Sequence, residues 1–124
     1  MKKIMLFLSI LAISCNSNDD NGDGQTNCTD IFVYGLNVTV KDAVTDATLN
    51  EGVLVKAVDG SYVETLLVEE IPSTVFVGAG ERAGNYIVTV SKDGYQTFTS
   101  QVIALTADEC HVIGQDITVE LQPE

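Results

Sequence analysis

The side chains with the widest chemical range in this 124-residue chain are three cysteines and one histidine. Cys28 and Cys110 flank the segment that carries dense apolar patterning, and His111 directly follows Cys110. In an oxidising compartment the two thiols can form a disulfide if the fold brings their Cα atoms within about 7 Å. The alternatives are two free thiols, or a metal site built from Cys28, Cys110 and His111, although zinc needs three or four converging ligands.

Nucleophilic or acid–base catalysis has little support in these residues. His111 is the only histidine, so any chemistry that needs an imidazole base would have to use it. The sequence contains no Gly-x-Ser-x-Gly, no His-Glu-x-x-His and no glycine-rich phosphate loop to accompany it. We therefore expect a structural or surface role for His111, and we expect that the chain is not an enzyme and uses no cofactor.

A run of acidic and amide side chains has the spacing of a calcium loop. Asp19, Asn21 and Asp23, followed by a glycine and later by Asp30, could surround one ion. No helical pattern flanks the run, and the last ligand is Asp rather than a bidentate Glu. The favoured interpretation is a solvated, flexible tether, because residues 16–27 include no apolar residue and many turn formers.

Strands must position the two cysteines and the histidine, because from Ile31 onward apolar and polar residues alternate. Range 62–71 also fits a helical face, but its β-branched residues and Pro72 favour a strand. The ranges expected to be extended are 31–41, 53–58, 62–71, 75–78, 86–91, 95–103 and 112–121. Short strands with frequent turn signals and no long helical pattern predict one all-β domain, a seven-stranded antiparallel Greek-key β-sandwich.

This architecture bears on the cysteines. Cys28 precedes the first expected strand and Cys110 precedes the last. The first and last strands of seven-stranded sandwiches commonly run side by side, which would bring the two sulfur atoms together. A disulfide that closes so long a span would contribute about 4 kcal/mol in the chain-entropy account.

The first fifteen residues have the features of an export signal. Lys2 and Lys3 precede the apolar run Ile4–Ile13, which is shorter than the roughly 20 helical residues that a bilayer requires. Leu11-Ala12-Ile13-Ser14-Cys15 resembles the lipobox of bacterial lipoproteins, although Ala12 stands where leucine is usual. The resemblance implies that Cys15 carries the lipid and anchors the protein stably in a membrane. The alternative is an ordinary secretory signal with an incidental cysteine.

The expected organisation is therefore a lipoprotein signal peptide (1–14), an acidic flexible tether that begins with lipidated Cys15 (15–27), and a β domain (28–124). Acidic residues shortly after the lipidated cysteine resemble the surface-export signal of Bacteroidetes lipoproteins. That resemblance implies an outer-membrane protein whose domain lies at the cell surface.

The charge balance narrows the choice of partners. The chain has 18 Asp and Glu against six Lys and Arg, a net charge of −12. Such a surface repels a phosphate backbone, so we expect no nucleic-acid partner. We interpret the charge as a contribution to solubility, with cation binding as the alternative.

Five short motifs are distributed along the β domain. They are Val38-x-Val40-x-Asp42, Gly52-Val53-x-Val55, Glu81-Arg82-x-Gly84-x-Tyr86, Gly94-Tyr95 and Cys110-His111-Val112. Together they resemble the bacterial carboxypeptidase regulatory-like domain, a sandwich of the transthyretin-like (prealbumin-like) and starch-binding-like group, over about Cys28–Pro123. Glu81 and Arg82 are expected on a hairpin, and Gly60, Gly84 and Gly94 suit turns with positive φ. The resemblance implies an accessory module and not a peptidase, because no catalytic domain remains.

The expected function is that of a lipid-anchored, non-catalytic module of the cell envelope, structural or protein-binding. The alternative is a carbohydrate-binding module of the starch-binding-like group, whose members stack sugars on exposed aromatic rings. The chain has no tryptophan, so Tyr34, Tyr62 and Tyr95 are the only platform that it offers.

Overall fold

The computed structural model of the protein describes residues 27–124, and these contain nine strands. The expected signal peptide (1–14), the lipidated Cys15 and three residues of the calcium-loop alternative, Asp19, Asn21 and Asp23, lie outside the described residues. Within 27–124 no helix is long and apolar enough to cross a bilayer. The strands are β1 (Tyr34–Asp42), β2 (Thr48–Leu49), β3 (Leu54–Asp59), β4 (Tyr62–Val68), β5 (Phe76–Gly80), β6 (Gly84–Ser91), β7 (Phe98–Thr99), β8 (Ile103–Leu105) and β9 (Gln115–Leu121).

The longer strands form where the apolar alternation is cleanest. In β1, Leu36, Val38 and Val40 are fully buried, whereas the residues between them are partly exposed. Strand β6 repeats the pattern with Tyr86 and Val88. Because successive side chains of a strand point to opposite faces, one face of each strand is available to the core.

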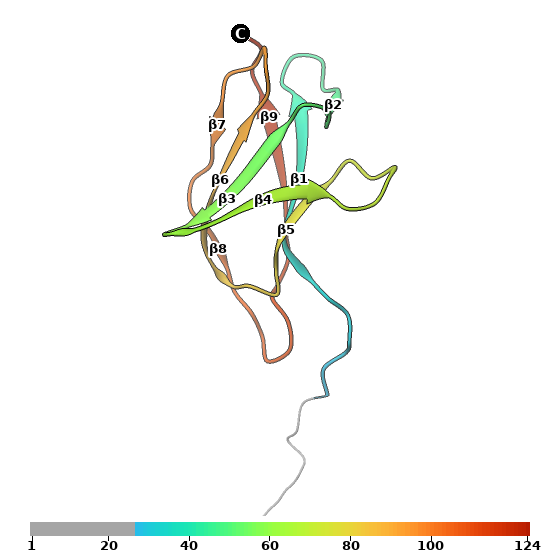
Figure 1. The fold of residues 1–124 in the computed structure, drawn as a ribbon, viewed down its shortest axis with the longest axis vertical. Coiled ribbons are helices and arrows are strands. Elements are labelled where there is room, and N and C mark those ends of the chain that lie inside the picture. Colours follow the sequence, from blue (N-terminus) through green and yellow to red (C-terminus); the bar gives the residue numbers. More distant parts are fainter. Residues whose placement is uncertain (1–26) are drawn as a thin grey trace, which may run out of the picture.

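Strand β1 is central to the topology (Figure 1). It pairs antiparallel with β5 along its first half and with β2 near its end, and it pairs parallel with β9 along its other edge. The other strand pairs of the described residues are antiparallel: β3 with β4, β3 with β6, β4 with β5, and β6 with β7 and β8. The parallel β1–β9 pair is a correction to the purely antiparallel sheet that the sequence predicted.

Strand β4 connects two groups of strands. Its first part pairs with β3, from Tyr62 opposite Asp59 to Leu66 opposite Val55. Its last two residues pair instead with β5. The inward faces of β1 and β9 and those of β3 and β6 contribute to a single core cluster, in which Tyr86 is the largest fully buried side chain.

The expected strands at 53–58, 75–78 and 86–91 are present within one or two residues, and Tyr62–Val68 is a strand and not a helix. The predicted number of strands was wrong, and so were the predictions for three segments. Nine strands occur where seven were expected, because Thr48–Leu49 pairs with β1 inside a segment predicted as a turn, and range 95–103 holds β7 and the start of β8. The last strand begins at Gln115 and not near Val112. Strands of two or three residues are too short to carry a periodic signal.

The turns follow the expected glycines at two of three positions. Gly60 and Gly94 have positive φ, as predicted. Gly84 does not; it begins β6, and a Cβ there would collide with the Asp59 carboxylate. Glycine at position 84 therefore suits the close approach of the Asp59 side chain. The hairpin expected at Glu81 and Arg82 was wrong, because β5 and β6 do not pair with each other; the positive φ values in this connection occur at Ala79 and Glu81.

Candidate functional site

Cys28 and Cys110 meet at one end of the domain. Their sulfur atoms are at bonding distance and their Cα atoms are 5.2 Å apart. The reason is the parallel pairing of β1 and β9, since parallel strands begin at the same end and each cysteine lies a few residues before its strand. This geometry fits the expected disulfide.

Glu81 connects its own turn to two other segments at this end of the domain. Its Oε1 accepts a hydrogen bond from the Val112 N–H, and its Oε2 accepts one from the Val33 N–H, both at 3.0 Å. His111 Nδ1 lies 2.7 Å from the same Oε2, and Thr29 Oγ1 lies 3.1 Å from His111 Nε2. The carboxylate thus joins the segment before β1, the β5–β6 turn and the loop before β9.

The row formed by Thr29, His111 and Glu81 has the order of a hydroxyl–imidazole–carboxylate relay. The hydrogen bonds that Glu81 accepts from the backbone of Val33 and Val112 are those of a structural clamp. Asp108 contributes to it by accepting hydrogen bonds from the Cys110 and His111 N–H groups. These contacts support the structural role expected for His111.

A second carboxylate, Asp42, is buried at the far end of β1, with 7% of its surface exposed. The Tyr95 hydroxyl donates to its Oδ2 at 2.6 Å, and the N–H groups of Val44 and Thr45 donate to its Oδ1 at 2.7 and 2.9 Å. The Tyr95 hydroxyl, followed by the two N–H groups, holds the pKa of Asp42 below its ordinary value. The pKa of Glu81 is lowered in the same way, chiefly by the Val112 N–H, against the opposing effect of burial.

These pKa shifts predict a loss of stability in acid. Asp42 and Glu81 have lower pKa values in the folded than in the unfolded chain. As the pH falls, the unfolded chain takes up protons first, so the stabilisation present at neutral pH is lost as the pH passes down through the lowered pKa values. We expect Asp42→Asn to be less stable than the wild type in urea at about pH 7, and the gap to narrow toward about pH 3. A gap that is independent of pH would contradict this assignment.

The three tyrosines proposed as a ligand platform do not lie together. Tyr34 begins β1 and donates to Glu69 at 2.6 Å, whereas Tyr95 is bound to Asp42, the last residue of β1. Nine residues of strand separate these two sites by roughly 26 Å. The hydrogen bonds to Glu69 and Asp42 raise the pKa values of Tyr34 and Tyr95.

Tyr62 is covered on one face of its ring. The Arg82 guanidinium lies 3.7 Å from the ring centroid, where it also bonds to Asp59 and to the Tyr86 hydroxyl. The Tyr62 hydroxyl donates to Glu64 at 2.9 Å, which raises the pKa of Tyr62. Arg82 therefore does not pair with its neighbour Glu81, as a surface hairpin would suggest, but stacks in a cation–π contact that leaves less of Tyr62 free for a sugar.

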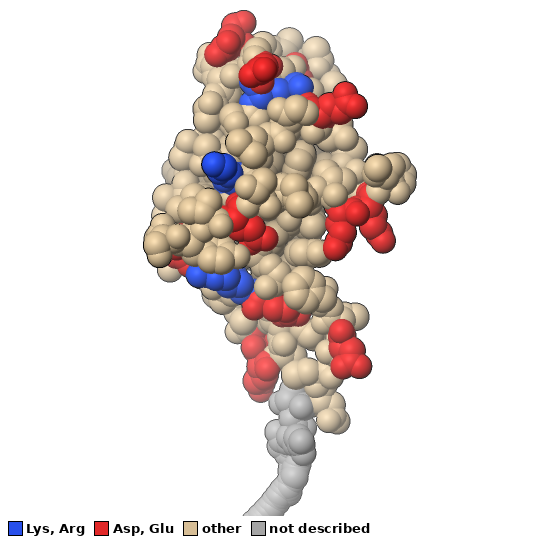
Figure 2. Space-filling view, in the orientation of Figure 1, with Lys and Arg blue, Asp and Glu red and all other residues tan. Residues whose placement is uncertain are grey.

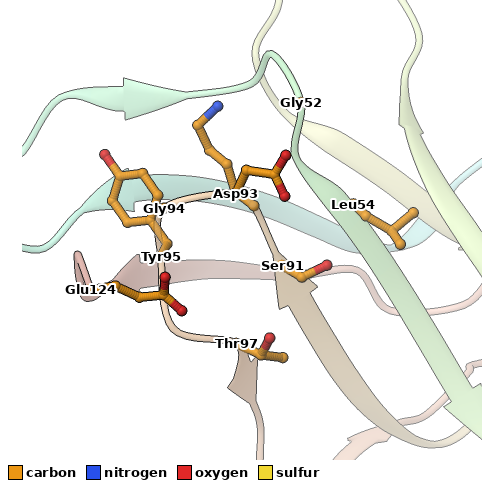
Figure 3. Close-up of a pocket in the computed structure, with 9 residues that line it drawn as sticks. Gly52, Leu54, Ser91, Asp93, Gly94, Tyr95, Thr97 and Glu124 are labelled. Atoms are coloured by element: carbon orange, nitrogen blue, oxygen red, sulfur yellow. The ribbon is translucent and has the colours of Figure 1, made fainter.

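A polar pocket of about 420 Å³ lies beside Tyr95 (Figure 3). Figure 3 shows the Asp93 and Glu124 carboxylates and the Ser91 and Thr97 hydroxyls around it, together with the Tyr95 ring. An aromatic ring beside carboxylates and hydroxyls is a combination that can bind a polar, hydroxylated ligand. Of the three predicted platform residues, Tyr95 is the one that lines this pocket.

A larger and more apolar groove, of about 610 Å³, lies between β3 and β4. It is lined by Asn50, Val53, Leu54, Thr65, Leu66, Leu67, Val68, Ile71, Pro72, Ser73 and Phe76. The Leu66 and Phe76 side chains are buried, whereas Leu67 is 66% and Ile71 95% exposed. The groove therefore has a buried apolar floor and an exposed apolar rim.

The groove arises because β3 and β4 separate. Their register ends at Val55 opposite Leu66, after which β4 pairs with β5. Figure 1 shows the two strands leaving their common hairpin and diverging toward the side where the β4–β5 loop projects. Ile71 stands on that loop. The apolar side chains of the groove line the space between the diverging strand ends.

The sequence did not identify this groove. Leu67 and Ile71 lay in a range that fitted a helical face and was predicted as a strand, and neither was singled out as a binding residue. The transfer of β4 from one partner strand to another is a tertiary event with no local periodic signature. One signal was present: Leu66 and Leu67 are adjacent, and a strand cannot place two successive side chains on the same face.

Within residues 27–124 no group of three or more His, Cys, Asp and Glu side chains is placed to hold a metal ion. Asp30, the one described residue of the calcium-loop alternative, is exposed.

Comparison with protein-family models and with curated proteins gives no match to this chain.

Proposed function

We propose that this protein is a lipid-anchored, non-catalytic module of the cell envelope, and that its β domain binds another protein through the groove between β3 and β4. The observation that carries the proposal is the exposed apolar rim formed by Leu54, Leu67 and Ile71. Scattered exposed apolar residues need no explanation, but a group of them around a hollow is typical of an interaction site.

We also propose a specific type of β fold and a lipid anchor. The domain is a transthyretin-like β-sandwich of the carboxypeptidase regulatory-like group. Support comes from the core shared by β1 and β9 on one side and by β3 and β6 on the other. The anchor is lipid on Cys15, and the location is the outer face of the outer membrane; support comes from the lipobox-like motif and the acidic residues that follow it.

Photo-crosslinking in intact cells tests the binding site. A photoreactive amino acid at position 67 should give a discrete covalent adduct with a second protein, because this side chain lines the groove. The same amino acid at Val44, which is 74% exposed on the turn between β1 and β2, is the matched control and should give none. Addition of Ile71→Asp to the position-67 variant should abolish the adduct. Equal labelling from positions 67 and 44, or no labelling from either, would overturn the proposal.

A second candidate function is carbohydrate binding at the polar pocket beside Tyr95. The observation in its favour is the presence of an aromatic ring, two carboxylates and two hydroxyls around one hollow (Figure 3). Carboxylates and hydroxyls can accept and donate the hydrogen bonds that sugar hydroxyls require. Because this pocket and the groove are lined by different residues except Leu54, variants at Leu67 and at Asp93 separate the two functions.

A further inference from the structure

We infer that the occupant of the groove is an extended segment of a partner protein, in which apolar side chains alternate with Lys or Arg. This inference deepens the proposed function and rests on it. Three features of the groove support it: its shape, the apolar side chains of its walls and the charge beside it.

The shape favours an extended segment. Both walls are strand ends, Leu54 on β3 and Leu67 on β4, and they separate just beyond the last paired residues, Val55 and Leu66. A chain that enters between two diverging strands can follow their direction and use the same spacing of side chains. A helix about 10 Å wide would not fit between strands that are still about 5 Å apart at the apex of the groove.

The walls favour an apolar anchor. Of the lining residues, Leu66 and Phe76 are buried and Val53 is half-buried, whereas Leu67 and Ile71 are exposed. Every second side chain of an extended segment would point toward this floor. Burial of such aliphatic side chains is favourable in proportion to the apolar area removed from water, so the anchors would supply the main attraction.

The charge beside the groove favours a basic segment. Glu69 and Glu70 directly precede Ile71 on the projecting loop, and they line a neighbouring hollow that shares Ser73 with the groove. Figure 2 shows Asp and Glu side chains beside this loop and at several other places on the same face, with fewer Lys and Arg side chains. The side chains that alternate with the anchors of a bound segment would face solvent near these carboxylates. At these positions Lys or Arg would be attracted, and Asp or Glu would be repelled.

The same charges argue against a second copy of this chain as the occupant. A symmetric dimer built on the loop would bring Glu69 and Glu70 of both copies together. The chain as a whole carries a net charge of −12. Like charges at an interface disfavour association, so the partner is a different, basic protein.

Defined peptides test this inference. Fluorescently labelled peptides of the type Gly-Lys-Val-Lys-Ile-Lys-Gly would be titrated with the full-length mature protein in non-ionic detergent, and binding followed by anisotropy. We expect the lysine peptide to bind at least tenfold more tightly than its glutamate counterpart, and the difference to shrink as salt is raised. Leu67→Asp and Ile71→Asp should each weaken binding at least tenfold, whereas Val44→Asp, with the same change of charge at a remote site, should not.

The possible results separate the two levels of the proposal. Equal affinity for the lysine and glutamate peptides, binding that survives Leu67→Asp, or absence of binding would overturn the inference about the partner's chemistry. The proposed function would still stand if the adduct from position 67 persists. A concentration-dependent dimer that Ile71→Asp abolishes would overturn the inference in favour of self-association.

Discussion

Replacement of both Cys28 and Cys110 by serine is expected to lower the free energy of unfolding by about 4 kcal/mol. The bond closes a span of 82 residues, which is most of the described domain, so its removal enlarges the ensemble of the unfolded chain. In a domain of about this size each kcal/mol corresponds to roughly 4–8 °C in the midpoint of thermal unfolding. Thermal unfolding followed by circular dichroism should therefore show a fall of roughly 15–30 °C.

Two controls separate the bond from other effects of the thiols. The wild type in excess reductant should unfold at the temperature of the double serine variant. Cys15→Ser, which removes the third cysteine outside the domain, should leave the midpoint unchanged. A reductant that has no effect on the unfolding of the wild type would contradict a disulfide between positions 28 and 110.

The disulfide end of the domain could be predicted because it needs only the positions of two strands and one common arrangement of them. Period-two alternation identifies β1 and the final strand, and each cysteine precedes one of them by a few residues. Adjacency of the first and last strands is then enough to bring the sulfur atoms together. That these strands are parallel explains why the two cysteines reach the same end.

The Glu81 clamp could be predicted only in part. The sequence marked Glu81 and His111 as notable residues but placed Glu81 on a surface hairpin. The structure gives Glu81 a positive φ, which turns its carboxylate toward Val33 and Val112. Non-glycine residues are uncommon in this conformation, and no sequence pattern announces it. Contacts between segments 30 to 50 residues apart depend on how the completed sheets pack.

The groove depends on tertiary structure in the same way. A strand that changes partner is continuous in sequence, so the adjacent leucines at 66 and 67 are the only local sign of the change. The side chain of Leu66 is nevertheless held tightly over β5, since a Cβ at Gly78 would lie 2.7 Å from Leu66 Cγ. Leu67, one residue later, is on the opposite face and is exposed. Two adjacent leucines therefore have different roles, one in the fold and one at the proposed interface.

Alanine substitutions at these two leucines test that division. Leu66 is 1% exposed, so Leu66→Ala should lower the free energy of unfolding by about 2–5 kcal/mol through lost burial and a residual cavity. Leu67 is 66% exposed, so Leu67→Ala should change it by no more than about 0.5 kcal/mol. Urea unfolding of both variants, with the disulfide intact, measures the difference.

The stabilities of Leu66→Ala and Leu67→Ala also decide how the binding experiments are interpreted. If Leu67→Ala is as stable as the wild type and yet weakens binding of the lysine peptide, the loss of binding arises at the rim of the groove and not from unfolding. If the two alanine variants are equally destabilised, Leu67 belongs to the core and the exposed rim does not exist. The groove would then be a consequence of how β4 changes partner strands, and the proposed binding site would have to be sought at the polar pocket beside Tyr95.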